Sequence, residues 1–82
     1  MTVRVRLFGE LKEHAPAGSA SRIFPYEVPE GTTAVQLIMR LGIPYGGEEG
    51  QMVVAVNDVE VDHGTVLREG DTVSLFEALA GG

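Results

Sequence analysis

Residues 29–42 read PEGTTAVQLIMRLG, and this stretch decides the fold because it predicts a helix with both ends marked. Thr33 and Gln36 fit a capping box, in which the hydroxyl accepts a first-turn amide and the glutamine side chain reaches back. Gly42 offers a left-handed stop, and Pro44 prevents continuation. One apolar stripe follows the helical period and should face a core: Ala34, Leu37, Ile38 and Leu41.

The segment before this helix predicts two strands joined by a loop with one helical turn at residues 10–14. Residues 3–8 alternate with period two, so Val3, Val5 and Leu7 should face the core. Phe8 then falls on the other side, together with the arginines of that strand. Residues 22–28 predict a second strand at a sheet edge, because Pro25 cannot donate to a strand ladder.

The segment after the helix predicts three more strands. Residues 52–56 form a continuous apolar run, typical of a strand near the middle of a sheet, and Asn57-Asp58 suits a tight turn. A short strand should return at residues 59–61. The last strand spans residues 72–76, and its alternation places three side chains on the outward side: Thr72, Ser74 and Phe76.

This order of elements predicts an α+β domain with a mixed sheet of four or five strands and one main helix on one face. The first and last strands can pair in parallel at the centre of the sheet. The opposite face should stay open, with Phe8 and Phe76 both pointing to it.

Composition limits the possible functions. The chain of 82 residues suffices for one domain, and it contains no cysteine to form a disulfide or a thiolate site. The net charge of −6 argues against nucleic-acid binding and would suit a basic protein partner. No apolar run has the length of a membrane span, and the alternating start differs from a signal peptide, so we expect a soluble cytoplasmic protein.

No group of residues indicates catalysis by this chain itself. His14 and His63 lack the spacing of a metal site or a catalytic triad and are interpreted as surface residues. The glycines of residues 43–51 could suggest a phosphate loop, but Glu48 and Glu49 lie among them and would repel an anion. We therefore expect no intrinsic catalytic residue, no metal and no bound cofactor.

Residues 77–82, EALAGG, are predicted to form an extended tail after a folded domain of residues 1–76. Two glycines at the end are unusual, although a frayed terminus is a common alternative. The tail can extend roughly 20 Å at about 3.3–3.6 Å per residue. Glycine at positions 81 and 82 lets the backbone pass a narrow channel, because it has no Cβ.

The chain resembles the ubiquitin-like β-grasp sulfur carriers, which include the small subunit of molybdopterin synthase and the thiamine sulfur carrier. The resemblance lies in the order of short motifs along nearly the whole chain: VRLFG at 5–9, PEGTT at 29–33, VAVN at 53–57, LREGD at 67–71, VSLF at 73–76 and the final AGG. Leu-Phe before the tail and Ala before the glycines are closer to the molybdopterin type. The chain departs from that type at Glu77-Ala78, where two prolines are usual, at Asp58, and in the short segment 42–52.

The resemblance implies that an E1-like enzyme uses ATP to adenylate the carboxylate of Gly82, and that a sulfur donor then converts it to a thiocarboxylate. Gly81, Ala80 and Leu79 would form the tail that enters the partner's active site. Phe8 and Phe76 would dock the activating enzyme and, in molybdopterin biosynthesis, a molybdopterin-synthase large subunit.

Three alternatives remain open at this stage. The sulfur could go to thiamine thiazole synthesis or another transfer pathway. The activated Gly82 could instead be joined to lysine amines, as in a ubiquitin-like protein modifier. The chain could also be a binding module in which the two glycines are incidental.

Overall fold

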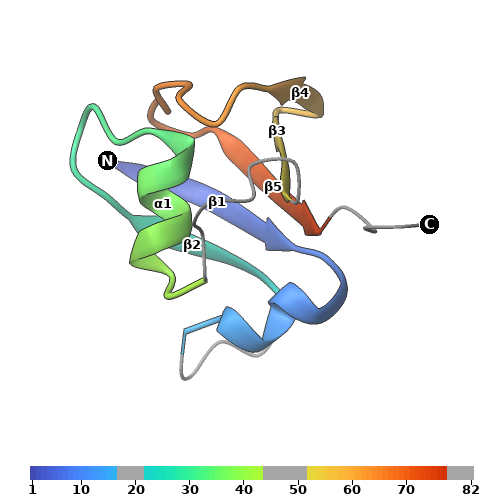
Figure 1. The fold of residues 1–82 in the computed structure, drawn as a ribbon. Helices are drawn as coiled ribbons and strands as arrows, with labels where there is room; N and C mark the ends of the chain where they lie inside the picture. The colour runs from blue at the N-terminus through green and yellow to red at the C-terminus, as the bar shows by residue number, and fades with distance from the viewer. Residues whose placement is uncertain (17–21, 44–51, 78–82) are drawn as a thin grey trace.

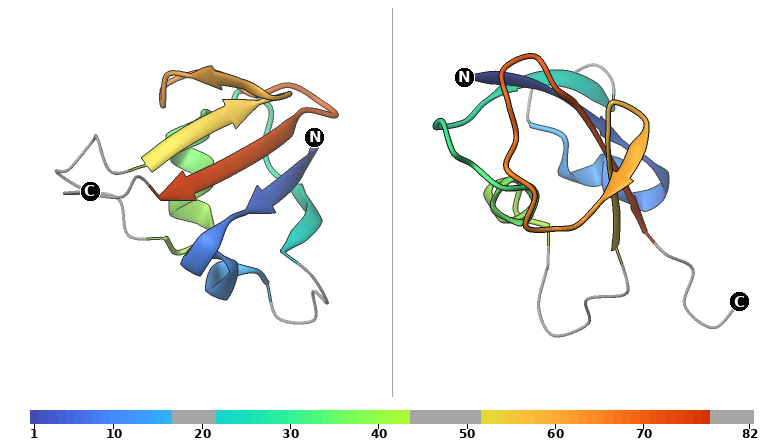
Figure 2. Two further views of the ribbon diagram at one scale, coloured as in Figure 1. Left: turned by 90° about the vertical axis from the view of Figure 1, so that its right-hand side faces the viewer. Right: turned by 90° about the horizontal axis from the view of Figure 1, so that it is seen from above.

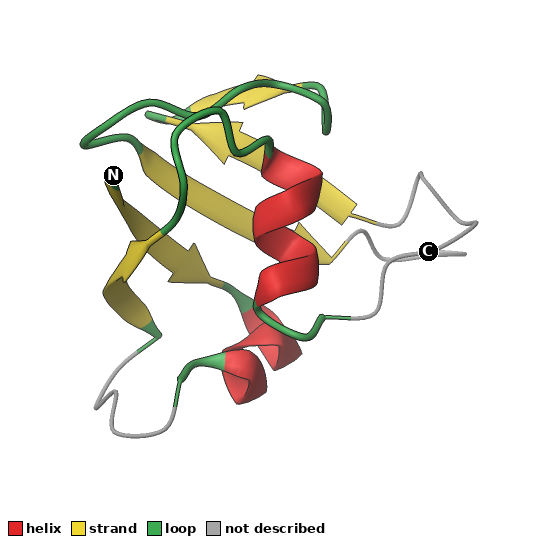
Figure 3. Cartoon of the chain, turned by 90° about the vertical axis from the view of Figure 1, so that its left-hand side faces the viewer, coloured by secondary structure: helices red, strands yellow, loops and turns green. Residues whose placement is uncertain are grey.

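The computed structural model describes residues 1–16, 22–43 and 52–77. The elements follow the order β1 (Thr2–Leu7), a 3-10 helix η1 (Gly9–His14), β2 (Ile23–Glu27), α1 (Ala34–Arg40), β3 (Met52–Val56), β4 (Val59–Val61) and β5 (Thr72–Glu77). The five strands form one mixed sheet in the order β2-β1-β5-β3-β4 (Figure 1). Helix α1 covers one face of this sheet (Figure 3). The predicted α+β β-grasp architecture is confirmed.

The centre of the sheet is a parallel pair made by the first and last strands. β1 pairs with β5 in parallel, with Val5 opposite Val73 and Leu7 opposite Leu75. β3 pairs with the other side of β5 in the antiparallel sense. Figure 2 (left) shows β5 in red between β1 in blue and β3 in yellow. β5 therefore has a hydrogen-bonded neighbour on each side.

The core lies between α1 and the inner face of the sheet. The predicted helix stripe is buried, with Leu37 and Ile38 fully inaccessible to solvent. The inward residues of the two central strands belong to the same core: Val3, Val5, Leu7, Val73 and Leu75. Both halves of the predicted capping box are present, since Thr33 Oγ1 accepts from the Gln36 amide and Gln36 Oε1 accepts from the Thr33 amide. The helix ends where Gly42 adopts a φ of 79°.

The edge position of β2 explains how a strand can contain Pro25. Arg4, which lies opposite Pro25, donates its own amide to Asp71 O at 2.8 Å, on the β5 side. Arg4 and Pro25 therefore form a non-hydrogen-bonded pair of the antiparallel ladder. The backbone nitrogen of Pro25 points away from β1, toward the open edge of the sheet. Placing the proline here leaves no sheet hydrogen bond unmade.

Several boundaries differ slightly from the sequence prediction, and β1 spans Thr2–Leu7 where the alternation predicts residues 3–8. β2 begins at Ile23 and ends at Glu27, one residue inside the predicted range at each end. The predicted helical turn is a 3-10 helix that begins at Gly9. β5 continues through Glu77, which pairs with Met52, so the strand extends one residue into the predicted tail.

The turn between β3 and β4 forms as predicted. Asn57 and Asp58 both take positive φ, at 53° and 72°. These residue types tolerate the left-handed region better than most others. The Asn57 side chain also joins this turn to the start of β5, because its carbonyl oxygen accepts from the Thr72 amide at 3.0 Å.

Candidate functional site

Phe8 and Phe76 stack on each other at the end of the central strand pair. Arg6 lies opposite Ser74 and Leu7 opposite Leu75, and the Phe8 amide continues the pairing by donating to Leu75 O at 3.1 Å. The two rings are nearly parallel, with centroids 4.4 Å apart and an interplanar angle of 11°. Both side chains are half-buried. The backbone register of β1 and β5 thus holds the two aromatic residues side by side, as their alternation predicted.

Two guanidinium groups lie beside this stack. The Cζ atoms of Arg6 and Arg22 are 5.2 and 5.4 Å from the centroid of the Phe8 ring. These distances fall within the range of a cation–π interaction. We name Arg6, Phe8, Arg22 and Phe76 the outer patch. Sequence reasoning found its two aromatic residues but did not assign its arginines to the site.

The Arg6 side chain also connects strand β1 to the turn between β3 and β4. Its Nη1 lies 3.5 Å from Oδ1 of Asp58, which belongs to the β3–β4 turn. Arg6 stands on β1, and β5 lies between β1 and β3, so the side chain must cross β5 to reach Asp58. The Asp58 side chain is 84% exposed, and the Arg6 side chain 34%.

Ser74 departs from the expectation of an open outer face. The register places it beside Arg6 on one strand and Ala55 on the other, yet it is only 2% exposed. Its hydroxyl oxygen is also buried without a hydrogen-bond partner. Its neighbours on the outer face are Arg6 of β1, Ala55 of β3 and, two residues along its own strand, Phe76. The direction predicted from alternation is therefore correct, but the exposure is not.

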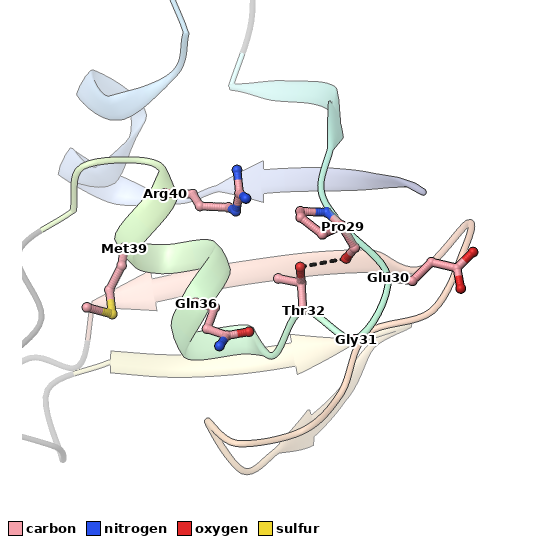
Figure 4. A pocket seen from close by; sticks show the side chains of 7 residues that line it. All are labelled: Pro29, Glu30, Gly31, Thr32, Gln36, Met39 and Arg40. Atoms are coloured by element: carbon pink, nitrogen blue, oxygen red, sulfur yellow. Dashed lines mark hydrogen bonds between the residues drawn. The ribbon is translucent and has the colours of Figure 1, made fainter.

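A hollow lies between α1 and the loop that precedes it, lined by residues other than those of the outer patch. Its volume is about 500 Å³, and seven residues line it: Pro29, Glu30, Gly31, Thr32, Gln36, Met39 and Arg40 (Figure 4). The buried Thr32 hydroxyl donates to Pro29 O at 2.6 Å and ties the loop together. Met39 is 61% exposed on the helix surface. These residues give matched controls for variants of the outer patch.

Neither histidine is one of the residues of the outer patch. His63 is part-buried, and its Nε2 lies 2.8 Å from Met52 O. His63 therefore lies only partly at the surface, and it links the loop before β5 to the start of β3. His14 is half-buried in η1. Within residues 1–16, 22–43 and 52–77, no group of three or more His, Cys, Asp or Glu side chains could hold a metal ion.

Several predicted residues lie outside the described residues. These are the tail positions Leu79, Ala80, Gly81 and Gly82, and the glycines between Pro44 and Gln51. The described chain ends at Glu77, the last residue of β5, on the same strand as Phe76. The tail therefore begins next to the outer patch.

The helix-covered mixed sheet, with its first and last strands paired in parallel, defines a ubiquitin-like β-grasp protein. The sequence model of the ThiS family matches residues 5–82. The chain belongs to the ThiS family.

Solved structures of similar fold support this assignment. The putative molybdopterin-converting factor subunit 1 of Pyrococcus furiosus is 25% identical, with a TM-score of 0.70 over 95% of this chain and 98% of that one. A chain of the complex of subunits 1 and 2 of the molybdopterin-converting factor from Helicobacter pylori is 28% identical, with a TM-score of 0.58 over 100% of both chains.

Another similar structure is small archaeal modifier protein 1 of Haloferax volcanii. It is 22% identical, with a TM-score of 0.71 over 95% of this chain and 98% of that one, and the likeness concerns the fold. No curated protein sequence matches significantly. Among the residues that the structure describes, no helix has the length and apolar character to cross a membrane.

Proposed function

We propose that this protein is a sulfur carrier in which Gly82 bears a free carboxylate that becomes a thiocarboxylate. The observation that carries the proposal is the extent of the family match, which runs from residue 5 through Gly81 and Gly82. The structure adds that β5, the central strand, leads directly into this segment from Glu77. The folded domain would thus bind the partner and hold the reactive Gly82 carboxylate in position.

The chemistry requires activation because a carboxylate is a poor electrophile. An E1-like enzyme would let the Gly82 carboxylate attack the α-phosphate of ATP, which releases pyrophosphate and forms an acyl adenylate. A hydrosulfide equivalent from a sulfur donor then attacks the acyl carbon, and AMP leaves. The product is the thiocarboxylate. In this scheme the carrier contributes a carboxylate and a docking surface, while the partner supplies the catalytic groups and ATP.

We infer that the outer patch docks the activating enzyme. Exposed aromatic surface at the centre of an interface often dominates its binding energy. The half-buried rings of Phe8 and Phe76 lie on the strands next to the tail, so a partner covering them would also receive the tail. Leu79 would extend the apolar surface.

The pathway that we favour is molybdopterin biosynthesis, with a synthase large subunit as the second partner. Two similar structures support this choice, since their names refer to the molybdopterin-converting factor and one is a complex of its two subunits. The Leu-Phe pair at 75–76 and Ala80 before the glycines agree with that type. Thiazole synthesis and conjugation to lysine remain the alternatives.

The test is an intact-mass measurement. The purified protein is incubated with its cognate activating enzyme, ATP and a sulfide source, and its mass should change by one exchange of oxygen for sulfur. Deletion of Gly82 should abolish the change without altering the thermal melt, because a tail residue contributes little to stability. If the truncated protein still gains sulfur, Gly82 is not the carrier position.

The same reaction separates carrier from modifier. A carrier should release its sulfur to a small-molecule precursor and return to the unmodified mass. A modifier should instead form covalent adducts to lysine-containing proteins that survive reduction and denaturation. Adducts of that kind, formed without any sulfur release, would replace the carrier assignment with the modifier one.

A further inference from the structure

Positive charge gathers on one side of an otherwise acidic protein. The net charge is −6, and only six residues are Lys or Arg. Arg6 and Arg22 lie within the outer patch, and Arg4 stands two residues before Arg6 on the same face of β1. Half of the basic residues therefore lie on the β1–β2 side of the sheet. Arg22 is distant from Arg4 and Arg6 in the sequence, but the pairing of β1 with β2 places the three arginines in the same region.

The other half of the same face is acidic. Asp58 occupies the β3–β4 turn, and Glu60 lies opposite Ala55, which is paired with Ser74 on the outer face. Both acidic side chains are exposed. Around the aromatic stack the face is thus electrically divided, with arginines beside the rings and carboxylates toward β4, while Glu27 of β2 lies opposite Thr2, at the other end of β1 from Phe8.

Among the residues that the structure describes, few groups compete for the charges of the two arginines of the outer patch. Each guanidinium lies over the Phe8 ring, which restrains it without neutralising its charge. The contact of Arg6 with Asp58 is 3.5 Å long and reaches a carboxylate that is 84% exposed. Such exposed pairs contribute little and are easily exchanged.

We propose that the partner surface has an apolar recess for the Phe8–Phe76 stack and presents carboxylates around it to Arg6 and Arg22. Asp58 forms an ion pair with Arg6 until this partner docks. The proposal rests on the docking role inferred above and specifies the chemistry of the partner. The net charge alone predicts a basic partner, whereas this proposal specifies an acidic surface on the partner.

Charge complementarity favours an acidic protein surface over a polyanion. A nucleic acid or an extended anionic surface would meet Asp58 and Glu60 as it crossed the face, and would be repelled by the net charge of −6. A folded protein can place carboxylates opposite the arginines alone. At physiological ionic strength charges interact over about 8 Å, so these local pairs outweigh more distant repulsion.

If Asp58 competes with the partner for Arg6, substitutions of the arginines should lower the affinity for the partner and substitution of Asp58 should raise it. Arg22→Glu should weaken binding by about tenfold or more, because it turns an attraction into a repulsion at the interface. Arg6→Gln should weaken it by about three- to tenfold. Asp58→Asn should strengthen it by about two- to fivefold, because it frees Arg6, and Asn tolerates the φ of 72° at this turn.

The experiment measures the dissociation constant of each full-length variant with the purified cognate activating enzyme, by calorimetry at low and high salt. Arg40→Glu is the control, since it makes the same charge change beside the hollow of Figure 4. Its affinity should stay within about twofold of wild type. The benefit of Asp58→Asn and the loss from Arg22→Glu should both shrink at high salt. Melting curves verify that each variant is folded.

The outcomes separate this inference from the proposed function. If wild type is adenylated and Arg22→Glu binds as well as Arg40→Glu, the acidic-partner inference is wrong and the carrier function stands. If Asp58→Asn weakens binding, Asp58 belongs to the interface rather than competing with it, and the second half of the proposal is wrong. If wild type neither binds nor is adenylated, both proposals are overturned.

Discussion

Phe76 combines two roles that a single variant can separate. The ring is half-buried and stacks on Phe8 at 4.4 Å, so it contributes to stability, but it also remains available to a partner. Phe76→Ala should weaken binding of the activating enzyme by about 2 kcal/mol. It should destabilise the fold by less than the truncation of a fully buried Phe, which costs about 3–5 kcal/mol, because the Phe76 ring is only half-buried.

Phe24→Ala is the matched control for this prediction. Phe24 is 5% exposed in the core, so its removal should cost about 3–5 kcal/mol of folding free energy. Its effect on affinity should be small once the fraction of unfolded protein is taken into account. Unchanged affinity of Phe76→Ala, together with a loss of stability like that of Phe24→Ala, would show that Phe76 serves the fold alone.

Ser74 gives a second prediction at the scale of one residue. Its hydroxyl is buried without a partner, so it bears a desolvation cost that no hydrogen bond offsets. Ser74→Ala should leave the free energy of unfolding within about 0.5 kcal/mol of wild type, or raise it. Ser74→Leu should destabilise, because the larger side chain occupies the path of Arg6 across β5.

Urea denaturation of both Ser74 variants measures these effects. A loss of more than about 1 kcal/mol in Ser74→Ala would mean that the hydroxyl is hydrogen-bonded in solution.

At the scale of elements, the buried stripe of helix α1 should contribute much of the free energy of unfolding, and its exposed face little. Leu37 is fully buried against the sheet, whereas Met39 on the same helix is 61% exposed. Leu37→Ala should lower the unfolding free energy by about 2–5 kcal/mol, and Met39→Ala should stay within about 0.5 kcal/mol of wild type. Chemical denaturation of the two variants tests the orientation of the helix. Equal losses would mean that the helix is rotated from the position described.

The elements could be predicted from the sequence because their signals are local. The capping box, the left-handed Gly42 and the turn at Asn57-Asp58 each act within a few residues, and all three occur in the structure. Pro25 similarly placed β2 at an edge. Boundaries shifted by single residues, since pairing with β3 rather than local preference carries β5 through Glu77.

The site was less predictable because it depends on contacts between distant segments. Alternation gave the directions of Phe8 and Phe76, but nothing in it shows that Arg22 would reach the Phe8 ring. The burial of Ser74 likewise needs the neighbouring strands in register. The tail glycines remain a sequence-based prediction, since they lie outside the described residues.

At the scale of the molecule, the strand order predicts how stability is distributed. β1 and β5 are each paired on both sides, whereas β2 and β4 are edge strands. Amide hydrogens of β1 and β5 should therefore exchange slowly and through global unfolding, while those of β2 and β4 exchange earlier. Hydrogen exchange followed by NMR tests this pattern. If β4 amides exchange as slowly as those of β5, opening occurs only by unfolding of the whole sheet.

The parallel pairing of β1 with β5 also has a consequence during synthesis. β1 is made first, yet its inner neighbour does not exist until residues 72–77 have left the ribosome. With β5 missing, β1 and β3 have no strand between them, and the core has lost Val73 and Leu75. Nascent chains of this protein should therefore remain unfolded until almost the entire domain has emerged. A chain stalled before β5 would be open to chaperones and proteases, and would present neither aromatic stack nor tail.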